Sequence, residues 1–217
     1  MRTAVGVPPD LARRRNRVLR PRDAAGVYAH PRAELARLAR NHAATALATG
    51  YYALTPMHRL GDPSWKPALD AVALAIAQAD YGADAVALVS VSAARYYGAI
   101  PRALGVSVVA VPKQRSAIST VVGQVVFTRR DVSSLDVQRI STELADGWVT
   151  TPEQTMLDLA LRPELGQVAR AEIDGAIRAL HQQADMSLVR ELAAAQRGSA
   201  AMRKICGLTE GGILAEP

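Results

Sequence analysis

The sequence predicts an α+β protein with an N-terminal winged helix-turn-helix, a mixed α/β region with a small sheet, and a helical C-terminal third. Three observations predict this class. Two short helical patterns precede a hairpin pattern, β-branched runs gather near the middle, and apolar residues recur at helical spacing after residue 151. The expected parts are a basic arm (1–17), the winged helix-turn-helix (18–60), a linker (61–67), a second domain (68–210) and a frayed tail (211–217).

The overall composition is that of a globular chain. The 217 residues are 49% hydrophobic and 21% charged, which excludes a disordered or fibrous protein. The single cysteine, Cys206, excludes an internal disulfide and any multi-cysteine metal site. No apolar window reaches the roughly 20 residues of a membrane span, and the N-terminus lacks the apolar region of a secretory signal. We therefore expect a cytoplasmic protein with no membrane partner.

Positive charge is concentrated at the N-terminal end. Residues 1–60 contain eleven arginines and only three acidic residues, whereas the remainder is nearly balanced. The excess of 23 arginines over 3 lysines is typical of a GC-rich genome, but a codon effect does not explain why acidic residues avoid the first sixty positions. This segregation predicts a polyanionic partner at this end, with nucleic acid as the first candidate.

The first seventeen residues contain a proline pair and an arginine cluster, Arg13, Arg14, Arg15 and Arg17. They are interpreted as a poorly ordered arm or a frayed helix after Pro9. Such an arm can contact phosphates, and the equally weighted alternative is a solvated tail.

The next elements follow the order of a winged helix-turn-helix. A short helix with Pro21 near its start precedes a second helix, Pro31 to about Asn41, whose apolar residues share one stripe. Thr49-Gly50 then marks a turn between two short strands. In this architecture a helix enters the major groove and the hairpin tip contacts the DNA backbone.

Side chains that could contact DNA lie away from the apolar stripe or on the hairpin. Guanidinium groups bind phosphate or read guanine, and asparagine can read adenine. The candidate DNA-binding residues are Arg22, Arg32, Arg37, Arg40, Asn41, Thr49 and Tyr51. The alternative is an amphipathic helix whose arginines only face water.

The remainder of the chain predicts a small sheet between helices. Helices are expected at about 68–79 and 83–97, the second closed by Gly98. Strands are expected at 106–111, at 121–127, at alternating positions 135–139 and, after a tight turn at Asp146-Gly147, at 148–150, giving a sheet of three or four strands. C-terminal helices are expected to begin at Pro152 with Thr151 as N-cap, near Gln167, after Asp185 and at Ser199.

Motifs for catalysis are missing from the sequence. It has no phosphate-binding glycine loop, no dinucleotide fingerprint and no kinase signature set, and its histidines are dispersed. We therefore expect no catalytic residue, no metal and no cofactor. Asp158, in an otherwise apolar helix, is expected to be a buried carboxylate bonded to an arginine or to backbone. A second cationic group could face an acidic partner protein or the same DNA, or could be ordinary solubilising charge: Lys113, Arg115, Arg129 and Arg130.

Several segments together resemble the AbiEi-type antitoxins of type IV toxin–antitoxin systems. They are Arg-Pro-Arg-Asp (20–23), Leu-Ala-Arg-Leu-Ala-Arg (35–40), Thr-Gly-Tyr-Tyr-Ala-Leu-Thr-Pro (49–56), Ser-Ala-Ala-Arg-Tyr-Tyr-Gly (92–98), Val-Val-Ala-Val-Pro (108–112) and Val-Thr-Thr-Pro-Glu-Gln-Thr-Met-Leu-Asp-Leu-Ala (149–160). The resemblance covers about residues 18–206, and the alanine and arginine content is similar to that of actinobacterial members.

The resemblance implies an N-terminal winged helix that binds operator DNA and represses its own operon. It also implies a C-terminal domain that neutralises a cognate nucleotidyltransferase toxin. The segment before the second helix is short for a three-helix head, and a truncated first helix would weaken DNA binding. One alternative is an atypical serine protein kinase that phosphorylates the toxin and needs ATP and Mg²⁺. Another is a plain repressor without a toxin partner.

Overall fold

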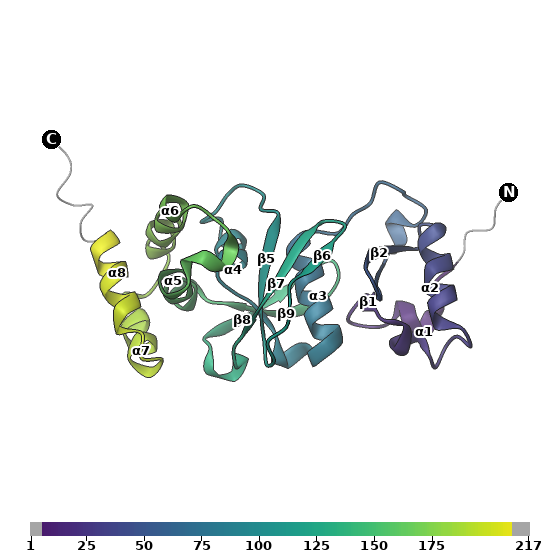
Figure 1. Cartoon of the computed structure of the whole chain (residues 1–217), viewed down its shortest axis with the longest axis horizontal. Coiled ribbons are helices and arrows are strands. Elements are labelled where there is room, and N and C mark those ends of the chain that lie inside the picture. Colours follow the sequence, from purple (N-terminus) through teal and green to yellow (C-terminus); the bar gives the residue numbers. More distant parts are fainter. Residues whose placement is uncertain (1–5, 210–217) are drawn as a thin grey trace.

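The computed structural model describes residues 6–209. The chain forms three parts along one long axis: a small N-terminal head (residues 6–60), a central sheet with one long helix on its head-facing side, and a group of helices at the C-terminal end (Figure 1). We call residues 69–209 the body. This arrangement confirms the predicted α+β class, with a helical C-terminal region.

The head combines short helices with a three-stranded antiparallel sheet. Its elements are α1 (Pro9–Ala12), β1 (Val18–Leu19), a 3-10 helix (Pro21–Ala24), α2 (Pro31–Arg40), β2 (Ala44–Ala48), β3 (Tyr51–Leu54) and a 3-10 helix (Met57–Arg59). The strands lie in the order β1-β3-β2. Between β2 and β3 the chain turns at Gly50, whose φ of +83° favours glycine.

The first described residues pack onto the rest of the protein. Leu11 of α1 is fully buried with Leu19, Leu35 and Leu38 in the head core. The Asn16 amide donates to the carbonyl of Ala75 at 2.8 Å, so this segment also contacts the body. Of the two interpretations, the poorly ordered arm is wrong for residues 8–17, because apolar burial and backbone hydrogen bonds hold them, whereas the expected helix near Pro9 is present as the short α1. Residues 1–5 lie outside the described residues.

The central sheet has six strands in the order β6-β7-β5-β4-β9-β8. The strands are β4 (Ala87–Leu88), β5 (Val106–Val111), β6 (Ile118–Thr120), β7 (Gly123–Arg129), β8 (Val137–Ser141) and β9 (Asp146–Thr150). The sheet is mixed, because β5 pairs in parallel with β7, and β4 with β9, while the other pairs are antiparallel. The prediction of three or four strands was too small.

Two strands account for the difference. The helix expected at 83–97 is instead a 3-10 helix (Ala83–Ala85), strand β4 and a short helix α4 (Val91–Tyr96), because an apolar run buried on both faces lacks a period that identifies it. The second unexpected strand is β6, and residues 121–122 form the turn between β6 and β7 rather than the start of a strand. Gly98 does close α4, with φ +74°.

The two faces of the sheet are covered by different helices. The face toward the head packs on α3 (Leu69–Tyr81), whose residues from Ala71 to Gln78 are all buried. The opposite face packs on α4 and on the C-terminal helices, listed here: α5 (Pro152–Leu161), α6 (Arg170–His181), α7 (Met186–Ala195) and α8 (Ser199–Thr209). Alternate residues of β5 point to the two cores, Val109 to the first and Val108 to the second.

Candidate nucleic-acid interface

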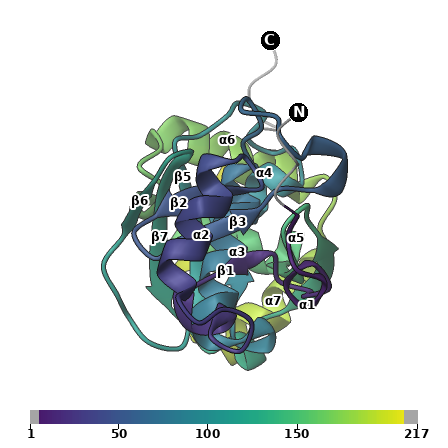
Figure 2. The ribbon, with the colours of Figure 1, turned by 90° about the vertical axis from the view of Figure 1, so that its right-hand side faces the viewer.

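Helix α2 forms the outer end of the molecule. Viewed along the long axis from the head side, α2 lies in front of the head sheet (Figure 2). Its N-terminus has Pro31 in the first turn, and Leu35 and Leu38 are fully buried beneath it. The opposite side of the helix is therefore available to a large ligand.

Two arginines on α2 are exposed and make no ion pair with a described residue, Arg32 and Arg40. They are eight positions apart, so their Cα atoms are separated by about 12 Å along the helix. Two guanidinium groups at this spacing can contact different phosphates of one duplex, or one phosphate and one base.

The other two candidates on this helix are partly engaged within the head. Arg37 forms an ion pair with Glu34 at 2.8 Å, one turn earlier. The Asn41 amide donates to the carbonyl of Arg37 at 2.8 Å and so caps the C-terminal end of α2. To read a base, Arg37 would have to break its ion pair with Glu34, and Asn41 would have to release the carbonyl of Arg37.

The hairpin contributes one exposed candidate and one that is turned away. Thr49 is exposed at the tip. Tyr51 is half-buried, and its hydroxyl donates to the carboxylate of Asp80 in α3 at 2.7 Å. The prediction that Tyr51 contacts DNA is therefore corrected, because its polar atom is already bound to the body. Arg22, by contrast, is exposed on the 3-10 helix before α2.

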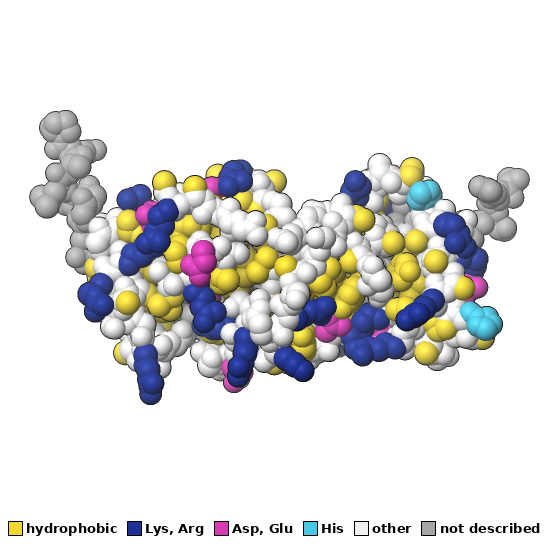
Figure 3. All heavy atoms as spheres, in the orientation of Figure 1, with side chains coloured by type: hydrophobic (Ala, Val, Ile, Leu, Met, Phe, Trp, Pro, Cys, Tyr) yellow, Lys and Arg dark blue, Asp and Glu magenta, His cyan; other side chains and the backbone are white. Residues whose placement is uncertain are grey.

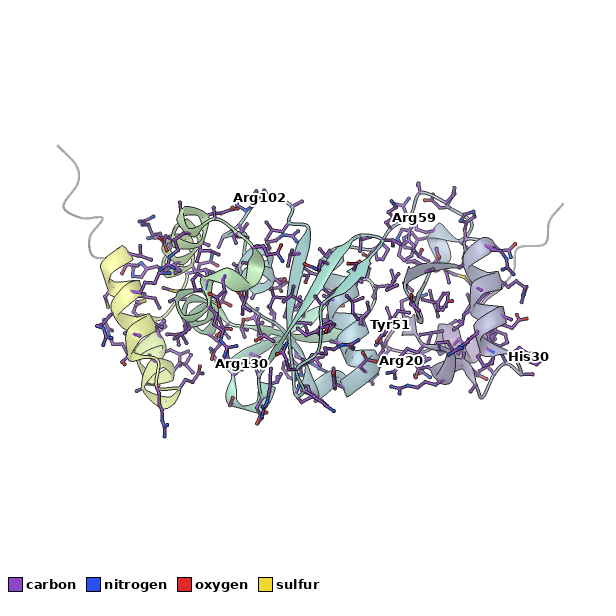
Figure 4. The ribbon with its side chains drawn as sticks, in the orientation of Figure 1. Arg20, His30, Tyr51, Arg59, Arg102 and Arg130 are labelled. Atoms are coloured by element: carbon purple, nitrogen blue, oxygen red, sulfur yellow. The ribbon has the colours of Figure 1, made fainter. Side chains whose placement is uncertain are left out.

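Asp80 is the centre of a polar cluster between head and body. Arg20 from the head donates to it at 2.5 Å, and Arg115 from the body also pairs with it. Figure 4 shows Arg20 and Tyr51 on the side of the head that faces α3. Burial raises the pKa of Asp80, but the hydrogen bonds from Arg20, Tyr51 and Arg115 outweigh it and hold that pKa below its usual value. The carboxylate is thus kept charged and fixes the head against the body.

The cations predicted as a second group do not form one surface. Arg115 is turned to Asp80 and stacks on Phe127, with its guanidinium carbon 4.6 Å from the ring centre. Arg130 pairs with the buried Asp158 at 2.8 Å, as expected for that carboxylate. Of these four residues, Arg129 and Lys113 are exposed. Arg129 lines a surface cavity together with Arg130, whereas Lys113 does not line it. The four side chains do not gather because Asp80 and Phe127 hold Arg115 and Asp158 holds Arg130, contacts that the positions of these residues in the sequence do not reveal.

Sequence reasoning missed Arg20 and Asp80 as interface residues. Arg20 belongs to the segment 20–23, for which the sequence suggests only a resemblance to the antitoxins, and Asp80 is one acid near the end of an apolar helix. Asp80 lies at the end of its helix, next to Tyr81, and the acids nearest to it in the sequence are Asp70 and Asp84. This position is the signal that could have identified it. Its three partners are between 29 and 60 residues away, so no local pattern connects them.

Cationic side chains extend over much of the surface in the view of Figure 3. Both ends of the molecule carry them. The exposed head arginines are Arg13, Arg14, Arg15, Arg22, Arg32, Arg40 and Arg59. No helix among residues 6–209 is long and apolar enough to cross a membrane. The head and body thus define a class of protein with a small basic N-terminal unit attached to an α+β body.

The body identifies the family. The model of the AbiEi antitoxin C-terminal domain matches residues 85–210, which is more than half of the chain. The chain therefore belongs to the AbiEi antitoxin family. The match begins after α3 and includes the whole strand order from β4 onward and the C-terminal helices, whereas the head lies outside it. No curated protein matches the chain.

Proposed function

We propose that this protein is the antitoxin of a type IV toxin–antitoxin pair that neutralises a nucleotidyltransferase toxin and represses its own operon by binding operator DNA. Membership of the antitoxin family supports the toxin-directed half. The observation that carries the DNA-directed half is the outward face of α2, where Arg32 and Arg40 make no ion pair with a described residue, at the free end of a head in which cations far outnumber acids.

The order of elements in the head supports a winged helix. A helix, a short strand, two helical segments and a hairpin follow one another, and the first strand pairs with the last. In such a unit α2 would be the recognition helix and the turn at Thr49-Gly50 would be the wing. The short turn and the four-residue α1 give this head a small contact area, so we expect moderate affinity for DNA.

The test is a gel shift with the promoter region of its own operon. Arg32→Ala combined with Arg40→Ala removes two unpaired cations, and we expect operator binding to weaken by roughly 1–3 kcal/mol if either one reads a base. Arg37→Ala should cost less, because its guanidinium is already paired with Glu34. Arg102→Ala in the body, where Arg102 pairs with Glu172, is the matched control and should leave binding unchanged.

The toxin-directed half is tested in the same variants. Cells that express the cognate toxin should grow when they also express wild-type protein or the Arg32→Ala, Arg40→Ala variant. Loss of operator binding with retained neutralisation would support separate sites in head and body. Loss of both activities in a folded double variant would contradict the division, and wild-type binding by that variant would contradict α2 as the recognition helix.

A further inference from the structure

A second polar site lies on the opposite side of the sheet from the head. A cavity of about 410 Å³ opens between the end of β7, helix α5 and the end of α7. We call it the α5 pocket, and its polar lining consists of Ser90, Thr128, Arg130, Ser134, Asp158, Arg162 and Gln196. Its volume is within the range of small-molecule sites, roughly 300–1,000 Å³. Figure 4 shows Arg130 on the body, far from the labelled residues of the head.

The charges in this pocket do not cancel. Arg130 and Arg162 bring two positive charges, and Asp158 is the one acid in the lining. Arg130 is paired with Asp158 at 2.8 Å, whereas Arg162 donates to the hydroxyl of Thr128 at 3.0 Å and has no acidic partner among the described residues. Burial raises the pKa of Asp158, and Arg130 acts against this shift. Two arginines against one acid make the pocket positive on balance.

Two buried polar atoms in the pocket have no hydrogen-bond partner among the described residues. They are the hydroxyl of Ser90, which is 1% exposed, and the second carboxylate oxygen of Asp158, which is 4% exposed. The first carboxylate oxygen of Asp158 is well satisfied, by Arg130 and by Gln154 at 3.1 Å. A buried polar atom without a partner costs about 1–3 kcal/mol, so a ligand that supplied a partner to both atoms would gain this free energy on binding.

The backbone at Ser90 has an unusual conformation. Ser90 follows strand β4 and has φ +55° and ψ −129°, a region that non-glycine residues rarely adopt. This conformation holds the residue at a sharp bend between strand and helix. Its cost must be offset by the surrounding packing, which includes the fully buried Val89 and Val91.

We propose that the α5 pocket binds a small metabolite that carries a phosphate group and a hydroxyl group. The guanidinium of Arg162, with the hydroxyls of Thr128 and Ser90, supplies donors for the phosphate oxygens. The free carboxylate oxygen of Asp158 accepts a hydrogen bond from the ligand hydroxyl. A simple anion would leave this acceptor unused, and a neutral sugar would leave Arg162 without a partner.

This assignment is independent of DNA binding, because none of the pocket residues lies in the head. It also differs from docking of an acidic peptide, which would need an extended groove beyond the pocket mouth. Leu161 lies at the pocket mouth and is exposed, so a docked peptide would cover this apolar side chain.

The test is isothermal titration of the full chain with three probes: ribose 5-phosphate, inorganic phosphate and ribose. We expect saturable binding of ribose 5-phosphate, weaker binding of phosphate and none of ribose. Arg162→Gln should weaken ribose 5-phosphate binding at least tenfold. Asp158→Asn should reduce the preference for ribose 5-phosphate over phosphate. Arg190→Gln, an exposed arginine of α7 outside the pocket, is the matched control.

Each other outcome overturns the proposal. Absence of binding by all three probes means that only water occupies the pocket. Equal binding by wild type and Arg162→Gln places the ligand elsewhere. Binding of a glutamate-rich peptide that depends on Arg162, without binding of ribose 5-phosphate, makes this a protein contact. Arg162 is exposed, so its substitution should leave the fold intact, and Ser90→Ala provides a second variant that removes only one hydroxyl.

Discussion

Two carboxylates of the body show how local surroundings decide the state of one residue type. Asp80 and Asp158 each pair with arginine, but Asp80 receives hydrogen bonds from three side chains, whereas Asp158 is enclosed and keeps one oxygen without a partner. The pKa of Asp80 is consequently lowered and that of Asp158 is raised. The first acid therefore stabilises the contact between head and body, and the second leaves an acceptor available in a pocket.

The lowered pKa of Asp80 predicts a loss of stability in acid. A carboxylate with a pKa below its unfolded value, about 3.9, stabilises the fold above that pH and loses this contribution as the pH falls through the folded pKa. Asp80→Asn should therefore lower the free energy of unfolding by roughly 1–3 kcal/mol at pH 7, less than for a fully buried pair. Urea unfolding between pH 7 and pH 3 should show the wild type losing more stability than the variant.

The control for this prediction is Asp84→Asn, since Asp84 is exposed and forms no ion pair with a described residue. It should follow the wild-type pH profile. A variant at Asp80 that matches wild type at pH 7 would mean that Arg20 and Arg115 do not depend on this carboxylate. The contact between head and body would then rest on apolar packing, through Val18, Leu47 and Ala53.

At the scale of elements, the sequence predicts the bounds of helices and strands best where the spacing of apolar residues agrees with the capping and turn residues. Helix α2 and the β2–β3 hairpin were expected within a few residues of their bounds, because Pro31 opens the helix and Thr49-Gly50 marks the turn. Asp185 likewise caps α7, its carboxylate accepting from the amide of Ser187 at 2.8 Å. The buried strand β4 was missed, because its neighbours in the sheet, and not its own residues, make it a strand.

The close packing of β9 on α3 gives a prediction about one glycine. A Cβ added at Gly147 would lie 2.6 Å from the amide nitrogen of Gln78 and 2.8 Å from a methyl carbon of Leu74. Gly147→Ala should therefore lower the free energy of unfolding by roughly 1–3 kcal/mol, as measured by urea or thermal unfolding. Gly175→Ala, in α6 with no atom within 4 Å of the new Cβ, should instead raise stability by about 0.5–1 kcal/mol.

The paired design distinguishes packing from backbone effects. Destabilisation by both substitutions would indicate that alanine is unfavourable for a reason other than contact with α3. A neutral result at Gly147 would show that Leu74 and Gln78 can shift away without cost. The side chain of Gln78 also donates to the carbonyl of Asp146 at 2.8 Å, so a shift there should break this hydrogen bond as well.

At the scale of the whole molecule, the basic end of the sequence corresponds to one end of the elongated structure. The sequence predicts a basic N-terminal end, and the structure places that end at one extremity of an elongated molecule, with α2 outermost (Figures 1 and 2). Exposure of Arg22, Arg32, Arg40 and Thr49 could be anticipated from helical spacing and turn position. The inward direction of Tyr51 and Arg115 could not, because it depends on contacts between segments 29 to 64 residues apart.

The arginine cluster at positions 13–15 gives a prediction that belongs to the whole charged surface. These residues are exposed although Leu11 and Asn16 anchor the segment on either side. If they contact phosphates, Arg14→Ala combined with Arg15→Ala should lower the slope of log affinity against log salt by about 1–2, with sequence preference unchanged. Gel shifts over a salt series, with the operator and a scrambled duplex, measure both quantities.

The matched control for that experiment is Arg190→Ala combined with Arg203→Ala, two exposed arginines at the opposite end of the molecule. Removing two charges there changes the net charge equally but should leave the salt slope as in wild type. A wild-type slope in both double variants would show that the 13–15 cluster does not touch the duplex. Equal reductions would show that affinity follows net charge alone, and the head would then have no special place in DNA binding.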